Sequence, residues 1–278
     1  MPKTFTVYRP GRAYPGLSVT GNRCALQCKH CQGRYLRGML PADSPERLLD
    51  VGLRLRDGGA SGVLISGGCD ANGTVPLMPF LDTIARLSSE MTVNVHTGLL
   101  DDEAARKLAA TGADVYSVDL LQDERTIKER LHLDARPEDY ENTIRSLISA
   151  GASVVPHVCV GLQPPRGEDR CLELLERLAI DGVVVLALMP PPGTMPAADL
   201  DDRLVAFVER ASRSPAPVLV GCMRPRGRWE TEVRCILAGA AGMASPSSRT
   251  VDWLRRNDYQ IVEKNVCCAL HRKMAPRT

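Results

Sequence analysis

The sequence lacks a long hydrophobic run, because no uninterrupted apolar stretch approaches the length that crosses a bilayer. Its first residues, Met-Pro-Lys-Thr-Phe-Thr-Val-Tyr-Arg, contain no apolar core of the kind that signal peptides carry. An excess of one charge is also missing, since 35 Lys and Arg stand against 33 Asp and Glu, for a net charge of +2. We therefore expect a cytoplasmic protein with neither a nucleic-acid nor a membrane partner.

Linkers, low-complexity segments and internal repeats are absent as well. The 278 residues, 44% of them hydrophobic, are enough for one large core. We therefore expect a single domain over residues 1–278. Residues 258–278 are expected to form a C-terminal tail.

Short β-rich apolar runs alternate with longer helical patterns, which is typical of βα units around a parallel sheet. Ser44 and Pro45 predict a helix start, and another helix is expected from about Glu168. Eight such units predict a (β/α)8 TIM-type barrel, complete or nearly so; the alternative is an open (β/α)6 partial barrel with a C-terminal extension. The expected strands are 17–20, 63–66, 93–96, 115–118, 154–160, 183–188, 218–220 and 242–244.

Ten cysteines are many for this chain, and in a reducing compartment clustered cysteines indicate metal binding or catalysis. Cys24, Cys28 and Cys31 form a C-x3-C-x2-C loop after the first expected strand. Three thiolates suit an iron–sulfur cluster with one open iron, and an open metal position allows chemistry. The alternative is a structural zinc site completed by His30 or a remote ligand, although zinc sites favour other spacings.

Further polar or flexible residues end the later strands, where such barrels place their active sites. Strand 63–66 runs into Gly67 and Gly68, a pair that lets the backbone approach a ligand, and then into Cys69. Ser117 and Asp119 are two apart, so both can point into the barrel. A turn and a solvated strand end are the alternatives for these two features.

Together these motifs resemble the radical S-adenosylmethionine (SAM) superfamily. The resemblance implies a 4Fe-4S cluster on the three-cysteine loop that binds SAM and reduces it to a 5′-deoxyadenosyl radical. Gly67 and Gly68 match a Gly-Gly-Glu motif that holds the SAM amino group, but Cys69 replaces the glutamate. The resemblance also implies contacts of Ser117 and Asp119 with the ribose of SAM. It implies further contacts near the adenine at His30, Val160 and Gly161.

The other cysteines fall into two groups. Cys171 and Cys235 lie in helical stretches and are expected in the core. Cys69, Cys222, Cys267 and Cys268 are expected at the barrel mouth if the tail returns there, where they offer ligands for a second, auxiliary 4Fe-4S cluster; coincidental burial is the alternative. Arg224, Arg226 and Arg228 are either anion ligands or solvated charges.

The motif set as a whole is similar to biotin synthase-related radical SAM proteins, a group that includes subunits of the two-protein lipoyl synthase. This resemblance implies sulfur insertion into an octanoyl chain on a carrier-protein lysine, with an auxiliary-cluster sulfide consumed. It also implies a second radical SAM subunit and a reductant such as ferredoxin or flavodoxin. The alternatives are another radical SAM chemistry, such as biotin synthase-like sulfur insertion, methylation or rearrangement, and a non-catalytic zinc or iron–sulfur module.

Overall fold

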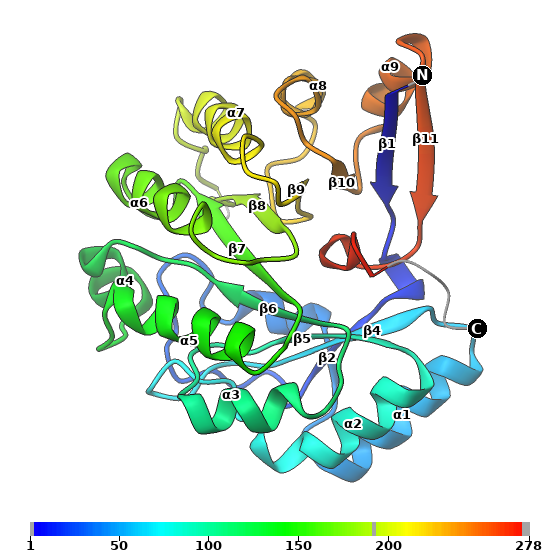
Figure 1. The fold of residues 1–278 in the computed structure, drawn as a ribbon, viewed down its shortest axis with the longest axis vertical. Coiled ribbons are helices and arrows are strands. Elements are labelled where there is room, and N and C mark those ends of the chain that lie inside the picture. Colours follow the sequence, from blue (N-terminus) through cyan, green and yellow to red (C-terminus); the bar gives the residue numbers. More distant parts are fainter. Residues whose placement is uncertain (1–2, 191–192, 274–278) are drawn as a thin grey trace.

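The computed structural model of the protein describes residues 3–190 and 193–273. Within this part of the chain, nine α-helices lie outside a curved sheet (Figure 1). The helices are α1 Pro45–Asp57, α2 Leu81–Glu90, α3 Asp102–Ala109, α4 Glu124–Leu131, α5 Pro137–Ser149, α6 Pro165–Leu175, α7 Leu200–Ala211, α8 Trp229–Leu237 and α9 Ser248–Arg256. The strands are β1 Lys3–Tyr8, β2 Gly16–Ser18, β3 Leu40–Pro41, β4 Gly62–Ser66, β5 Thr92–His96, β6 Val115–Asp119, β7 Val154–Val160, β8 Val183–Ala187, β9 Val218–Val220, β10 Gly242–Ala244 and β11 Tyr259–Lys264.

The strands form one parallel sheet in the order β11-β1-β10-β9-β8-β7-β6-β5-β4-β2-β3. Every expected strand overlaps an observed one, and β1, β3 and β11 are additional. The order begins at β11 and ends at β3, so the sheet curves around a lumen without closing (Figure 1). The expected α/β barrel is confirmed, in an open form.

The helix starts follow local capping chemistry. Ser44 Oγ accepts a hydrogen bond from Arg47 N at 3.2 Å, and Pro45 opens α1, as predicted. α6 begins at Pro165, three residues before the predicted start at Glu168, because a proline at the first position suits a helix start.

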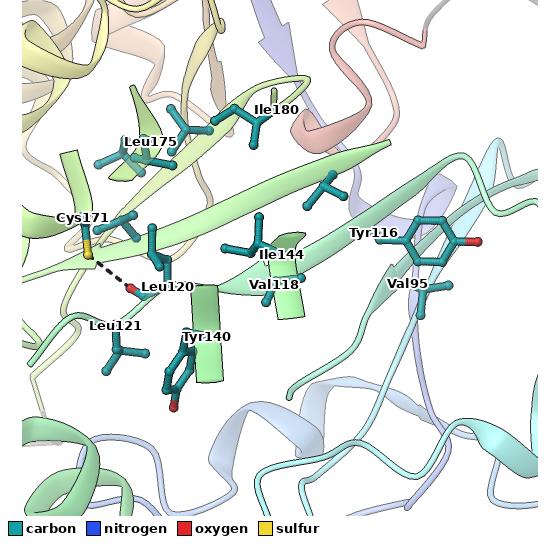
Figure 2. Packing of buried hydrophobic residues seen from close by; sticks show 14 of the residues in the cluster. Val95, Tyr116, Val118, Leu120, Leu121, Tyr140, Ile144, Cys171, Leu175 and Ile180 are labelled. Carbon is teal, nitrogen blue, oxygen red and sulfur yellow. Dashed lines mark hydrogen bonds between the residues drawn. The ribbon is translucent and has the colours of Figure 1, made fainter. Parts of the chain in front are cut away.

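The main core lies between the sheet and its helices. Alternating side chains of the strands, such as Val95 of β5 and Val118 of β6, belong to this core together with Tyr140 and Ile144 of α5 (Figure 2). The Cys171 thiol of α6 is fully buried and donates to Leu120 O at 3.7 Å. Cys235 is buried too, so both cysteines are core residues, as expected.

A second, smaller apolar cluster fills the floor of the lumen. The 3-10 helix η4, Cys268–Leu270, packs there against inward side chains of β6 to β9. Ser61 Oγ, just before β4, donates to Asn265 O at 3.0 Å, and Arg272 Nη2 donates to Pro215 O, before β9, at 3.0 Å. These anchors lie at the amino ends of the strands. The tail therefore enters the lumen from the end opposite the mouth, which corrects the expectation that it crosses the mouth.

Candidate active site

The three-cysteine loop follows β2 and is held by backbone turns. Cys31 N and Gln32 N both donate to Cys28 O, at 3.0 and 2.8 Å. Gln27 and Gln32 adopt left-handed φ angles of 45° and 49°, which fold the chain tightly around the thiols. The Cys28 thiol is buried and lies 3.6 Å from Leu131 O, so the loop is also tied to the end of α4.

Two thiols of this loop, those of Cys28 and Cys31, are joined by a hydrogen bond. A hydrogen bond from Cys28 holds the pKa of Cys31 at about 6, and the same bond, followed by burial, raises the pKa of Cys28. The negative charges of Cys31 and Cys24 raise the pKa of Cys28 further. Because the thiolate is the metal-binding form of cysteine, this donor set fits a metal cluster.

The glycine pair is built into the same loop. Gly68 N donates to Thr20 Oγ1 at 2.7 Å, and Ala25 N donates to Cys69 O at 2.8 Å. A Cβ on Gly68 would lie 2.1 Å from Arg23 O, so only glycine fits against the loop. The three-cysteine loop and the glycine pair thus form one structural unit, although they are 36 residues or more apart in the sequence (Cys31 to Gly67).

Cys69 belongs to this unit. Burial, then the negative charges of Cys24, Asp119, Asp70 and Cys31, raises the pKa of its thiol to about 12. Its role as one of four auxiliary ligands stays a prediction. The structure places Cys69 with the three-cysteine loop because its backbone is hydrogen-bonded to that loop.

Two histidines and an aspartate gather in the lumen, His96 and Asp119 at the ends of β5 and β6 and His157 in the middle of β7. His96 Nε2 lies 3.4 Å from Asp119 Oδ1, and the His96 and His157 rings stack with their centroids 5.1 Å apart. Asp119 lies deep inside the lumen, with protein around it. Its side chain is still 58% exposed, because it faces the open space of the lumen.

The charges of this group depend on one another. Burial opposes ionisation of Asp119, but the charge and hydrogen bond of His96 outweigh it and hold the pKa of Asp119 at about 2. Burial likewise opposes protonation of His96, and Asp119 outweighs it and raises the pKa of His96. Burial and then the positive charge of His96 lower the pKa of His157 to about 4. At neutral pH His157 is therefore neutral, and Asp119 favours the protonated form of His96.

Ser117 and Asn94 connect this group to the floor. Ser117 Oγ donates to Asn94 Oδ1 at 2.9 Å, and Asn94 Nδ2 donates to Cys267 Sγ at 3.5 Å. Sequence reasoning missed Asn94 and His96. Their spacing of two at the end of an expected strand is the signal that would have found them.

A second group of thiols consists of Cys222, Cys267 and Cys268. A hydrogen bond from Cys268 holds the pKa of Cys267 at about 7, and the same bond raises the pKa of Cys268. Burial, followed by the charge of Cys267, raises the pKa of Cys222. Three of the four expected auxiliary ligands therefore lie within electrostatic reach of one another.

The predicted adenine contacts are only partly available. Gly161 N donates to the buried Glu168 Oε1 at 2.7 Å, and Leu188 N donates to Val160 O at 2.8 Å. Arg203 Nη2 donates to the same Glu168 oxygen at 2.6 Å. Sequence reasoning missed this buried ion pair, because a charged pair across two helices leaves no local pattern.

His30 has a buried Nδ1 without a hydrogen-bond partner among the described residues. Its ring, with Asp119, His157 and Cys159, lines a cavity of about 50 Å³. An unpaired buried nitrogen beside the thiol loop fits a site that is completed by a polar ligand.

The three arginines after β9 have partners within the protein. Arg224 is 3% exposed and pairs with Glu232 at 2.7 Å, Arg226 donates to Ser245 O and Cys222 O, and Arg228 pairs with Asp201. All three therefore help to hold the loop after β9 in place, Arg228 by tying it to α7, and only Arg226 is also solvent-exposed.

In residues 3–190 and 193–273, no three His, Cys, Asp or Glu side chains meet closely enough to hold one metal ion. The thiolates of a four-iron cluster bind different irons, so they need not meet at one point. The same part of the chain contains no helix that is long and apolar enough to cross a membrane.

Comparisons with known proteins agree with this geometry. The family model described as the radical SAM superfamily matches residues 18–183. A biotin synthase from Sorangium cellulosum (strain So ce56) is 27% identical over 248 residues, which are 81% of this chain and 68% of that protein. A biotin synthase from Citrifermentans bemidjiense is 27% identical over 189 residues, which are 64% of this chain and 56% of that protein.

Solved structures share the fold. The FeFe-hydrogenase maturase HydG from Carboxydothermus hydrogenoformans superposes with a TM-score of 0.66 at 14% identity, over 98% of this chain and 70% of that one. Methylornithine synthase (PylB) superposes with a TM-score of 0.61 at 16% identity, over 87% of this chain and 72% of that one. The family model spans the thiol loop, the glycine pair and strands β4 to β7, so this chain belongs to the radical SAM superfamily, which uses a 4Fe-4S cluster with SAM.

Proposed function

We propose that this protein is a sulfur-inserting radical SAM enzyme, and that it forms one half of a two-protein lipoyl synthase acting on an octanoyl chain on a carrier lysine. The observation that carries the proposal is the second thiol group, Cys222, Cys267 and Cys268, which lies close to His96 and is separate from the Cys24 loop. Two separate thiol groups suit an enzyme that makes a radical at one and takes sulfur from the other.

In this proposal Cys24, Cys28 and Cys31 hold the radical SAM cluster. When bound, the cluster and SAM supply a 5′-deoxyadenosyl radical that abstracts hydrogen from carbon. Asp119 is ionised and faces the lumen, so it can accept hydrogen bonds from ribose hydroxyls. His30 offers an unpaired nitrogen beside the loop.

Cys222, Cys267 and Cys268 are the proposed ligands of an auxiliary cluster. Adjacent cysteines on the lumen floor, one of them with a lowered pKa, are suited to hold iron. The relatives named biotin synthase, at 27% identity, support sulfur insertion as the class of reaction. We further propose a cytoplasmic enzyme that is reduced by ferredoxin or flavodoxin and works with a second radical SAM subunit.

The polar lining of the lumen favours a second candidate, a radical SAM enzyme acting on a polar substrate. Asp119 and His157 line the cavity beside His30, and His96 contacts both of them. An octanoyl chain would leave these groups without ligand partners, and buried polar groups that lose hydrogen bonds are costly. A substrate with amide or hydroxyl groups would pair with them.

An anaerobic assay decides between these functions. The reconstituted protein is given SAM, a reductant and an octanoyl-lysyl peptide, with and without a candidate partner subunit, and products are identified by mass spectrometry. The proposal expects thiolated octanoyl peptide, about eight irons per chain, and about four in the Cys222→Ala, Cys268→Ala variant. Cys235→Ala, in the core, is the control and keeps its iron. Deoxyadenosine without a sulfur-containing product would refute lipoyl synthesis and leave the second candidate.

A further inference from the structure

Cys69 is the fourth thiol at the three-cysteine loop. It is not an isolated cysteine, because the charges of Cys24 and Cys31 act on its thiol and the neighbouring Gly68 touches Cys24. The Cys69 carbonyl accepts a hydrogen bond from Ala25 N at 2.8 Å, within the C-x3-C segment itself.

The contact between the two segments is rigid. Gly68, next to Cys69, touches Cys24 so closely that a Cβ would lie 2.6 Å from Cys24 Cβ and 2.7 Å from Cys24 Cα. The Gly68 amide is fixed on Thr20 Oγ1 at 2.7 Å. The Cys69 side chain is therefore carried at a constant place relative to the loop that is proposed to hold the cluster.

In the usual four-cysteine arrangement, each iron of a four-iron cluster takes one thiolate. Cys24, Cys28 and Cys31 account for three of them. At the third position of the glycine motif, where the resemblance implies a glutamate that contacts SAM, this chain has a cysteine, a residue type whose thiolate is an iron ligand.

We propose that the Cys69 thiolate is the fourth protein ligand of the resting radical SAM cluster and that SAM displaces it on binding. This rests on the proposed cluster site at Cys24, Cys28 and Cys31. In the exchange the iron–sulfur bond to Cys69 breaks, and the SAM amine takes its place on the iron. The ammonium of SAM must lose a proton to bind, and the released Cys69 thiolate accepts that proton. No electron moves.

Such a ligand occupies the fourth iron's free coordination position until SAM binds. An iron without a protein ligand accepts solvent or small thiols and is the one lost on oxidation. Cys69 therefore protects the cluster without blocking its use.

The test uses a parent protein with Cys222→Ala and Cys267→Ala, so that only the loop cluster is present, and compares it with the same protein carrying Cys69→Ala. Without SAM, the reduced Cys69→Ala protein should change its EPR spectrum when free imidazole is added, and mild ferricyanide should convert its cluster to the 3Fe-4S form in several-fold higher yield. The parent should resist both. Cys159→Ala, which removes another thiol beside Asp119, is the control and should behave as the parent.

Equal responses of the parent and Cys69→Ala would overturn the proposal. So would an unchanged resting spectrum with weakened SAM binding, since Cys69 would then act on SAM and not on iron. A second measurement needs no variant: Cys69 of the natural chain should react with iodoacetamide in the cluster-free protein and be protected in the loaded protein before SAM is added. Equal alkylation in both states would also refute the ligand. Neither readout uses the octanoyl peptide, so sulfur insertion stands or fails separately.

Discussion

Gly68 and Cys24 are in direct contact, and no other residue type fits at Gly68. A Cβ there would meet Arg23 O at 2.1 Å and Cys24 Cβ at 2.6 Å. Because of this close approach, the backbone that follows β4 lies directly against the loop of Cys24, Cys28 and Cys31. The glycine of this motif therefore shapes the thiol site itself, in addition to any contact with SAM.

Gly68→Ala should therefore displace the cysteine loop. We expect a loss of about 1–3 kcal/mol in the free energy of unfolding, because the clash involves backbone, and a clear drop in iron bound per chain. Iron analysis after anaerobic reconstitution and urea unfolding measure both. Gly67→Ala is the matched control, since its Cβ would meet Thr20 and Val19 side chains at 3.1 Å and these can give way. A Gly68→Ala protein with full iron content would contradict this account.

His96 and Asp119 should titrate as a pair. Asp119→Asn removes the charge that raises the pKa of His96, so the pKa of His96, measured by NMR of its ring protons, should fall. His157→Gln removes a neighbouring imidazole and should not lower it. An unchanged pKa of His96 in Asp119→Asn would show that the pair is not coupled.

The same pair makes stability depend on pH. The raised pKa of His96 contributes stability that is complete below the unfolded-state pKa of about 6.5 and is lost as pH rises through the folded-state pKa. The depressed pKa of Asp119 contributes stability above about pH 4 that is lost as pH falls towards 2. Urea unfolding against pH should show the difference between parent and Asp119→Asn shrinking at both ends of this range.

Asn94→Ala should weaken the floor of the lumen. The substitution leaves Ser117 Oγ and Cys267 Sγ without this partner, and buried polar groups without a partner cost about 1–3 kcal/mol each. Urea unfolding measures the loss, and the alkylation rate of Cys267 in the metal-free protein should rise. Ser117→Ala removes only one of the two bonds and should cost less; equal losses would argue against a role for the bond to Cys267.

Glu168→Gln should destabilise the loop after β7. Removing the charge of buried Glu168 leaves Arg203 only the more distant and exposed carboxylate of Asp199, at 3.7 Å, and breaking a buried ion pair costs about 3–5 kcal/mol. The Gly161 amide loses its carboxylate, so the KM for SAM should rise more than kcat falls if Gly161 contacts the adenine. Asp169→Asn, one residue on, breaks an exposed pair with Arg210 and should cost about 0–1 kcal/mol. Similar losses from both variants would refute the role of burial.

Local patterns in the sequence were enough for the βα units, because strand and helix periodicity are properties of neighbouring residues. The apolar runs at 154–160 and 218–220 coincide with β7 and β9, and Ser44 caps α1. The strands β1 and β11 were missed because they pair across 251 residues or more (Tyr8 to Tyr259), and the second partner of β1, β10, is also distant in the sequence. The open form of the barrel follows from that pairing.

By itself the sequence determined the thiol chemistry: the spacing of Cys24, Cys28 and Cys31 places three sulfurs in one loop whatever the rest of the chain does. Only the tertiary structure decided which distant residues share that site. In the folded protein Cys69 lies against the loop, Cys267 accepts a hydrogen bond from Asn94, and His96 pairs with Asp119. These contacts depend on strand register and on the direction from which the tail enters, and neither is set by residues close together in the chain.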